Sequence, residues 1–478
     1  MNMRAYKAAV PLLISLLAGC SFIPDYHRPA LPVATQWPVT ISSTPGPAAS
    51  DIGWRNFFAD PALQELIAFS LAHNTNLRVA VLNVSQAQAQ YTLDRSALFP
   101  SVQGEGSLYN THTPASATGG VSFSYREYSL VGAVSWELDL FGKIRSEAQA
   151  AHEQYLSNVD TVLSERISLV SQIAAEYYTW LADRDALRIA QETASAQQQS
   201  LRLTQLAADH GIYTAMDVAQ AQTTVDTALA NVAQYTRQVA QDMDEIVLLA
   251  GAPPPQELLQ RMQAVSGLEA TPPLPDVPAG LPSDLLERRP DIRAAEHMLL
   301  AANANIGAAR ADFFPSVMLT GDGGVASPTL NHLFAPGNHV WTFQPTITLP
   351  IFMGGQNIAN LDIAKLQKRI EIAYYESAIQ SAFHDVSDAL NARGTYVMQV
   401  QAEQDLVAAD TRYYNLANMQ LTAGTNTYLN VLIADNSLLT ARLDLVSIRL
   451  AALQNAITLY KALGGGWQEH TAPAPPLP

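Results

Sequence analysis

Residues 156–181 read LSNVDTVLSERISLVSQIAAEYYTWL. Apolar side chains recur in this stretch at steps of three and four residues, which places them on one face of an α-helix. They are Leu156, Val159, Leu163, Ile167, Val170, Ala174, Tyr177 and Leu181. The surrounding segment 147–208 contains no proline, so we predict one uninterrupted helix. About 65 residues at a rise of 1.5 Å would make a rod roughly 100 Å long, whereas an ordinary helix has about a dozen residues.

The second half of the sequence repeats this pattern. Residues 285–315 parallel residues 70–100, and a second helical segment follows at about 357–421. Each long helix is predicted to break at a glycine, Gly211 in the first half and Gly424 in the second. Matching residues lie roughly 213 positions apart, which far exceeds the period of a solenoid repeat. We interpret the pattern as duplication of a whole half.

Each half also carries two candidate β-strands. Apolar residues alternate with small or polar ones at 101–110 and 128–140, and again at 316–325 and 340–350. Alternation over about ten residues is what a membrane hairpin requires, and an ordinary soluble ribbon is the alternative. Four strands are fewer than the eight of the smallest membrane barrel, so identical chains would have to close the open edges. Two copies would supply eight strands and three copies twelve, and the pattern favours neither.

These signals predict the domain layout. Both repeats should run helix, hairpin, long helix, tip turn and returning helix. The hairpins are expected at 101–140 and 316–350, the tip turns at 210–214 and 422–427, and the opening helix of the first repeat at about 61–98. The segments are a signal peptide (1–19), a lipidated arm (20–60), a first repeat (61–252), a Pro-rich linker (253–284), a second repeat (285–466) and a C-terminal tail (467–478).

The N-terminus has the features of a secretory signal. Arg4 and Lys7 precede the apolar run 8–17, and small residues follow it. The sequence LAGC at 17–20 looks like a bacterial lipobox, which implies cleavage before Cys20 and a covalent lipid on that residue. An ordinary signal peptide with an incidental cysteine is the alternative. Ser21 is typical of lipoproteins sent to the outer membrane.

Composition and motifs exclude several classes of function. Cys20 is the only cysteine, which rules out an internal disulfide and a cysteine-based metal cluster. The net charge of −16 argues against nucleic acid as a partner. The ten histidines form no zinc-binding motif, and no nucleophile elbow, phosphate loop or dinucleotide fingerprint is present, so we expect no metal site and no enzyme. Acidic neighbours such as Asp242 and Asp244 are expected on a solvated helix face.

Beyond the signal peptide, the sequence offers no helix long and apolar enough to span a membrane. No later stretch reaches the roughly 18 continuous apolar residues that such a helix needs. Any membrane-spanning part is therefore expected to be a β-barrel.

Several motifs resemble the outer-membrane factor family of tripartite efflux systems, the TolC-like channels, and most closely its NodT-type lipoprotein branch. They are LAGC at 17–20, FADPAL at 58–63, ERRPDI at 287–292, IGA at 306–308 and ALGGGW at 462–467. The resemblance spans nearly the whole chain. It implies an α+β membrane protein in which three chains build a 12-stranded outer-membrane β-barrel, four strands from each, continuous with a 12-helix periplasmic α-barrel.

The same resemblance implies a passive export duct for small molecules such as drugs and toxic compounds. The homotrimer would dock on a periplasmic adaptor and an inner-membrane pump of the resistance-nodulation-division (RND) type, and would need no cofactor besides the lipid on Cys20. The exit duct of a type I-like secretion system is one alternative. A structural coiled-coil lipoprotein is another, and it leaves the hairpins unexplained. A general diffusion porin would not need helices of ~100 Å.

The resemblance also assigns the two helix breaks to periplasmic tips that dock the adaptor. Relatives commonly carry a gate carboxylate where this chain has Ile433, with Asn430 one turn earlier and Asp435 two positions later. A carboxylate ring would favour cations, whereas an isoleucine ring would close the pore by excluding water. Asp217 and Asp435 are further gate candidates, and the alternative for both is a first-turn acid near the positive end of a helix dipole. The tip residues are Gly211, Ile212, Tyr213, Thr214, Gly424, Thr425, Asn426 and Thr427.

Overall fold

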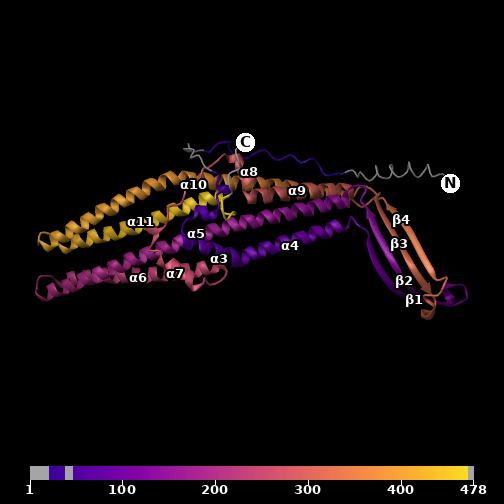
Figure 1. The fold of residues 1–478 in the computed structure, drawn as a ribbon, viewed down its shortest axis with the longest axis horizontal. Helices are drawn as coiled ribbons and strands as arrows, with labels where there is room; N and C mark the ends of the chain where they lie inside the picture. The colour runs from indigo at the N-terminus through magenta and orange to yellow at the C-terminus, as the bar shows by residue number, and fades with distance from the viewer. Residues whose placement is uncertain (1–20, 38–46, 472–478) are drawn as a thin grey trace. The chain divides into compact units, whose positions relative to one another are not determined.

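The computed structural model describes residues 21–37 and 47–471 (Figure 1). The chain forms two compact units, each built from three stretches of sequence. Unit 1 comprises Met1–Ala30, Asn83–Val159 and Ala294–Glu376, and unit 2 comprises Leu31–Leu82, Asp160–Arg293 and Ser377–Pro478. Four helices contribute residues to both units, namely α4 (Thr75–Ser96), α5 (Lys143–Asp209), α9 (Pro290–Ala311) and α10 (Gln356–Thr422).

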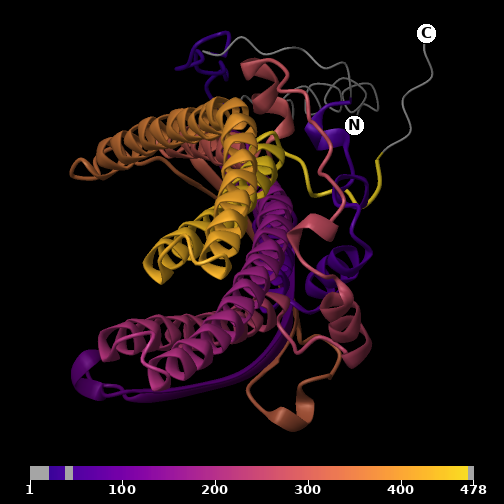
Figure 2. The same cartoon turned by 90° about the vertical axis from the view of Figure 1, so that its left-hand side faces the viewer.

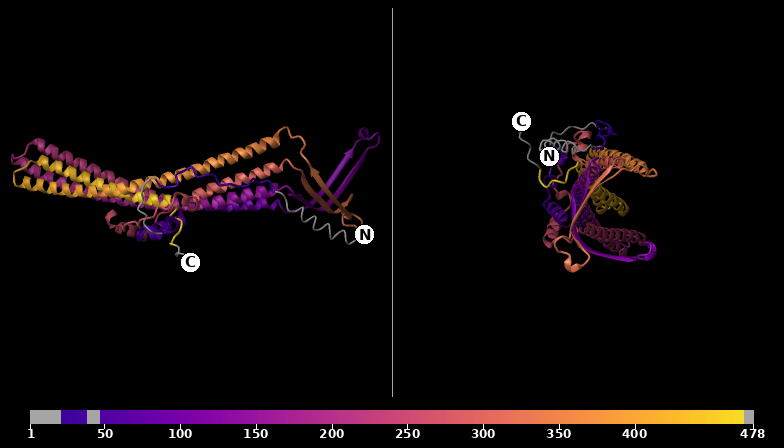
Figure 3. Two further views of the ribbon diagram at one scale, coloured as in Figure 1. Left: turned by 90° about the horizontal axis from the view of Figure 1, so that it is seen from above. Right: turned by 90° about the vertical axis from the view of Figure 1, so that its right-hand side faces the viewer.

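Unit 1 contains a four-stranded antiparallel sheet in the order β1-β2-β3-β4. Its strands lie side by side in Figures 1 and 3 and are β1 (Ser101–Thr113), β2 (Phe123–Leu138), β3 (Ser316–Ser327) and β4 (His339–Thr348). The two hairpins join where Val134 of β2 faces Gly321 of β3. β2 begins five residues before its predicted start, because β1 is long enough to pair with the extra residues up to Thr113 opposite Phe123.

The two predicted long helices are confirmed. Helices α5 and α10 have 67 residues each, or about 100 Å at 1.5 Å per residue. Within unit 2, α6 (Ala215–Ala250) runs back beside α5, and α11 (Tyr428–Ala462) runs back beside α10 (Figures 1 and 2). Among the described residues, no helix combines the length and the apolarity that crossing a membrane requires.

The core of unit 2 forms where the second half of the predicted stripe meets the segment that begins at Trp54. Ile167, Val170, Ala174, Tyr177 and Leu181 are all buried. The hydroxyl of Tyr177 donates a 2.8 Å hydrogen bond to Asp60, and Phe57, in α2 (Trp54–Phe57), stacks on Tyr460 with ring centroids 3.9 Å apart. The first half of the stripe belongs to unit 1, where Leu156 and Val159 are only half-buried.

The opening helix predicted at about 61–98 is two helices, α3 (Pro61–His73) and α4. Asn74 separates them. Its side-chain oxygen accepts a hydrogen bond from the amide of Leu77 at 2.8 Å, which caps α4. Its side-chain nitrogen donates a hydrogen bond to the carbonyl of Leu249 at 2.7 Å, which holds the break between α3 and α4 against the end of α6. The continuous helix was wrong because this N-cap residue stands inside an otherwise helical pattern.

The linker (253–284) lies against α5 in unit 2 and contains α7 (Gln256–Ala264), and α8 (Leu285–Arg288) follows it. The guanidinium of Arg184 donates hydrogen bonds to the carbonyls of Met262, Gln263 and Val265 just at the end of α7. The adjacent carboxylate of Asp185 accepts from the amide of Leu268 at 2.9 Å. Two consecutive residues of the long helix therefore hold the linker in place.

Candidate functional site

The first tip turn connects α5 to α6, and Gly211 ends the descending helix. Gly211 has a positive φ of 76°, a conformation that glycine adopts without steric cost. Its amide donates to the carbonyl of Ala208, and the amide of Ile212 donates to that of Ala207, both at 2.9 Å. These paired bonds are a Schellman motif, which satisfies carbonyls that a helix end would leave unpaired.

The returning helix of the first tip begins with a capping box between Thr214 and Asp217. The Thr214 amide and hydroxyl donate to the Asp217 carboxylate at 2.8 and 2.7 Å, and the Asp217 amide donates to the hydroxyl at 3.3 Å. The two bonds that the carboxylate accepts, led by that from the Thr214 amide, lower the pKa of Asp217. Asp217 thus lies in the first turn of α6, as one of the two interpretations predicts.

The second tip turn ends its descending helix in the same way. Gly424 has a φ of 72°, its amide donates to the carbonyl of Leu421, and the Thr425 amide donates to that of Gln420, both at 3.0 Å. The start of α11 differs, because the Thr427 side chain makes no capping bond. Instead the side-chain oxygen of Asn426 accepts from the Thr427 amide at 2.9 Å and from the Asn430 side chain at 2.5 Å.

Four large apolar side chains are exposed in the first turn and near the starts of α6 and α11. Exposed fractions are 72% for Ile212, 76% for Met216, 57% for Leu429 and 48% for Ile433. Leu429 and Ile433 are four residues apart and therefore share one face of α11. Met216 and Leu429 were missed in the sequence, where the four-residue spacing of Leu429 and Ile433 was the available signal.

Asp435 does not lie with Ile433. It is the eighth residue of α11, so the first-turn interpretation is wrong for this residue. Its carboxylate accepts a hydrogen bond from Gln197 of α5, and burial raises its pKa despite that bond and the nearby Arg442. Two residues along a helix correspond to a rotation of about 200°, which turns Asp435 toward α5 while Ile433 stays exposed.

The sheet of unit 1 has two chemically different faces. Alternate residues of a strand point to opposite sides, and the register carries each side across all four strands. Val102, Trp341 and Ile347 on one side are 74, 78 and 71% exposed, a large apolar surface for a protein. The apolar side includes Val102, Leu130, Val134, Leu319, Trp341, Phe343 and Ile347, and the other includes Gln103, Glu105, Ser107, Glu127, Ser129, Thr320, Asp322 and Thr342.

Asp242 and Asp244 differ in their surroundings. Asp244 is exposed, as expected for a solvated face. Asp242 is half-buried, and burial together with the negative charges of Asp183 and Glu176 raises its pKa to about 7. The solvated-face expectation was wrong for Asp242 because α5 presents its own acids opposite.

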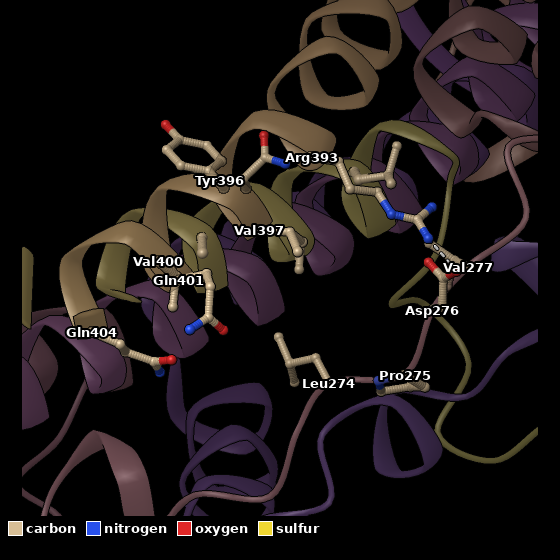
Figure 4. Close-up of a pocket in the computed structure, with 14 residues that line it drawn as sticks. Leu274, Pro275, Asp276, Val277, Arg393, Tyr396, Val397, Val400, Gln401 and Gln404 are labelled. Carbon is tan, nitrogen blue, oxygen red and sulfur yellow. Dashed lines mark ion pairs between the residues drawn. The ribbon is translucent and has the colours of Figure 1, made fainter. Parts of the chain in front are cut away.

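A groove of about 630 Å³ in unit 2 lies between the linker and helices α10 and α11 (Figure 4). Leu274 and Pro275 lie across it from Val397 and Val400, and Asp276 pairs with Arg393 at one end. No nucleophile with an adjacent base lines this groove. In the described part of the chain, no group of three or more His, Cys, Asp or Glu side chains could hold a metal ion.

The predicted lipid site, Cys20, lies outside the described residues. The prediction of a lipid on Cys20 therefore rests on the sequence motif alone.

A family model described as Outer membrane efflux protein matches residues 66–252 and 281–465 of the chain. The chain is 46% identical to the toluene efflux pump outer membrane protein TtgC of Pseudomonas putida, over 96% of this chain and 95% of the relative. It is 37% identical to the cation efflux system protein CusC of Escherichia coli, over 96% of this chain and 99% of the relative.

A solved structure has the same fold. The open state of the MtrE outer membrane channel of Neisseria gonorrhoeae superposes with a TM-score of 0.87 and 36% identity, covering 95% of this chain and all of that one. Family match, sequence identity and fold agree over nearly the full length. The chain therefore belongs to the outer membrane efflux protein family and is the outer-membrane channel component of an efflux pump.

Proposed function

We propose that three copies of this chain close their sheets into one 12-stranded barrel and form a passive export duct. The observation that carries this proposal is the sheet. Among the described residues, β1 and β4 each have one edge with no strand partner, and such edges seek another strand. One face is apolar and suits lipid, while the other is polar and suits a water-filled lumen.

The helices support the same assembly. In unit 1, α10 exposes Ile363, Leu366, Ile370 and Tyr374 at steps of three and four residues, a row that a neighbouring copy would cover. With α5, α6, α10 and α11, each chain would supply four staves of a 12-helix periplasmic tunnel. Equivalent elements follow in the same order in both halves, which supports two repeats at 61–252 and 285–466.

The partners and the cargo follow from the efflux role. We propose that the tips dock on a periplasmic adaptor and, through it, serve an RND-type inner-membrane pump. Gly211, Ile212, Thr214, Gly424, Thr425 and Thr427 are exposed, as docking residues must be, and Tyr213 and Asn426 are partly exposed. The 46% identity to a toluene efflux component favours small organic molecules as cargo. A lipid on Cys20 would anchor each chain.

We propose that the gate closes by excluding water. Ile433 and Leu429 are the exposed apolar residues of this part of α11, whereas Asp217 is held in its capping box and Asp435 is turned toward α5. Asn430 is engaged with Asn426. A ring of isoleucines at a narrow point resists water and ions without any charge.

Purified full-length protein tests the duct. It should run as a heat-modifiable trimer on gel electrophoresis and form discrete conducting channels in planar lipid bilayers. A trimer that never conducts would favour the structural coiled-coil alternative. Extraction of Cys20→Ser as a soluble monomer would refute the duct, since the sheet alone should keep the chain in the membrane.

Ile433→Asp tests the gate in the same bilayers. We expect a higher conductance of the closed channel and a shift of selectivity toward cations, because three carboxylates would hydrate the constriction and attract positive ions. Ile433→Val keeps an apolar ring and should behave as the wild type. Unchanged conductance and selectivity in Ile433→Asp would remove this residue from the gate.

A further inference from the structure

Residues 21–30 lie in extended conformation along α9, within unit 1 (Figure 1, the indigo trace beside α9). The carbonyl of Phe22 accepts from Arg310 at 3.0 Å, that of Pro24 accepts from Asn303 at 2.8 Å, and Arg28 reaches Glu296 at 2.8 Å. The arm thus runs antiparallel to the helix. From Phe22 to Arg28 an extended chain covers roughly 20 Å, and from Arg310 to Glu296 the helix covers about 21 Å, so the two stay in register.

The surface that receives the arm is shaped for close approach. A Cβ added to Gly307 would lie 2.6 Å from a side-chain carbon of Ile23 and 2.9 Å from its amide nitrogen, so no larger residue fits there. Ile23 packs on a cluster of three buried alanines, Ala150 of α5 with Ala301 and Ala304 of α9. Small residues on two helices therefore form a groove that the arm fills.

Charge secures the far end of the arm. The guanidinium of Arg28 donates two hydrogen bonds to the carboxylate of Glu296, at 2.8 and 2.9 Å, and the hydroxyl of Tyr26 donates a third at 3.0 Å. Glu296 is itself mostly shielded from water, with 12% of its side chain exposed. A bidentate, partly buried pair of this kind is stronger and more specific than an ordinary surface ion pair.

The near end of the arm meets the sheet. The ring of Phe22 stacks on Phe314 with centroids 4.6 Å apart, and Phe314 stacks on Phe141 at 4.9 Å. Strand β3 begins at Ser316, two residues after Phe314. Cys20 precedes Phe22 by two residues, a reach of at most about 7 Å.

We propose that residues 21–30 are a strap and that the groove along α9 is its peptide-binding site. The docked strap, and not the lipid, fixes where the N-terminus meets the membrane, at the base of the strands. Only the position of the N-terminus at the membrane rests on the proposed lipidation of Cys20. The docking itself depends on the contacts of Glu296 and Gly307.

Limited proteolysis of the full-length protein in detergent tests the strap. If the arm is docked, chymotrypsin should cleave after Tyr26 only when the arm leaves the groove, and mass spectrometry identifies the released fragment. Gly307→Val blocks the groove, and Glu296→Gln weakens the ion pair. We expect cleavage after Tyr26 to be about tenfold faster in Glu296→Gln, since hydrogen bonds to charged groups contribute enough for a change of that size. Gly307→Val should accelerate it at least as much, because the added side chain would occupy the place of Ile23.

Three matched variants should retain wild-type protection. Gly394→Val changes a helical glycine with no atom within 4 Å of an added Cβ, and Asn305→Gln changes an exposed residue of α9. Cys20→Ser removes the lipid and leaves the groove intact. Wild-type cleavage rates in Gly307→Val and Glu296→Gln would overturn the strap, and so would rapid cleavage of Cys20→Ser. Bilayer conductance of the same samples reports the duct separately, since a wild-type channel that conducts while its arm is cleaved rapidly would refute the strap and leave the duct standing.

Discussion

Gly211 and Gly424 occupy corresponding places in the two tip turns, and both end their helices with the same pair of backbone hydrogen bonds. Three residues further on, the turns diverge. Thr214 and Asp217 close a reciprocal capping box, whereas Thr427 has no side-chain cap and Asn430 binds Asn426 instead. The duplicated halves thus keep the stop signal of the first helix and differ in the start signal of the second. We infer that the first tip resists local opening better than the second.

Substituting the shared glycines should have the largest effect and should affect both tips alike. In Gly211→Ala and Gly424→Ala, the left-handed backbone costs about 1–2 kcal/mol for a residue with a Cβ. We expect amide exchange at the substituted tip to accelerate roughly tenfold by mass spectrometry. Gly394→Ala, within a helix and without a positive φ, should slow exchange slightly. A large effect at one tip only would mean that the two stop signals are not equivalent.

Substituting the third residue of α6 and of α11 should have different effects at the two tips. Asp217→Ala removes the capping box, and we expect exchange across residues 212–218 to rise about fivefold, a usual size for a lost cap. Asn430→Ala at the matching position should change exchange at the second tip by less than twofold, because no capping box exists there to lose. Equal effects would contradict the difference between the tips.

The smallest effect should be on the pH dependence of protection from amide exchange, which should have opposite signs around Asp217 and Asp435. The folded-state pKa of Asp217 is lowered, so its stabilisation is present above its unfolded pKa of about 4 and is lost as pH falls through the folded value. The folded-state pKa of Asp435 is raised by burial, so its contribution is lost as pH rises from about 4 through the folded value.

Exchange rates corrected for the intrinsic effect of pH would measure this contrast. As pH falls from 7 toward about 4, protection around Asp435 should increase, and protection of the first tip should stay constant. Below pH 4, the first tip should lose protection. Asp435→Asn should abolish the increase in protection around residue 435, and Asp217→Asn should abolish the loss of protection at the first tip. A pH response that survives its own substitution would assign the titration to another group.

The sequence predicted the elements whose signals are long and periodic. The stripe at 156–181 and its counterpart predicted both 67-residue helices, and alternation located the four strands. The features that the sequence did not predict depend on single side chains. Asn74 divides a helix by capping its own successor, and Asp435 reaches across to Gln197. The strap needed Gly307, whose role depends on a segment almost 300 residues earlier in the chain.

The open edges of the sheet have a consequence for how the channel appears in the cell. Within the described residues, one chain leaves β1 and β4 each with an unpaired edge. Joining a second copy satisfies two edges and still leaves two open, and only the copy that completes the proposed ring removes them all. Incomplete assemblies therefore gain little, and the yield of channels should rise steeply with chain concentration. A modest fall in expression would then cost the cell disproportionately many ducts.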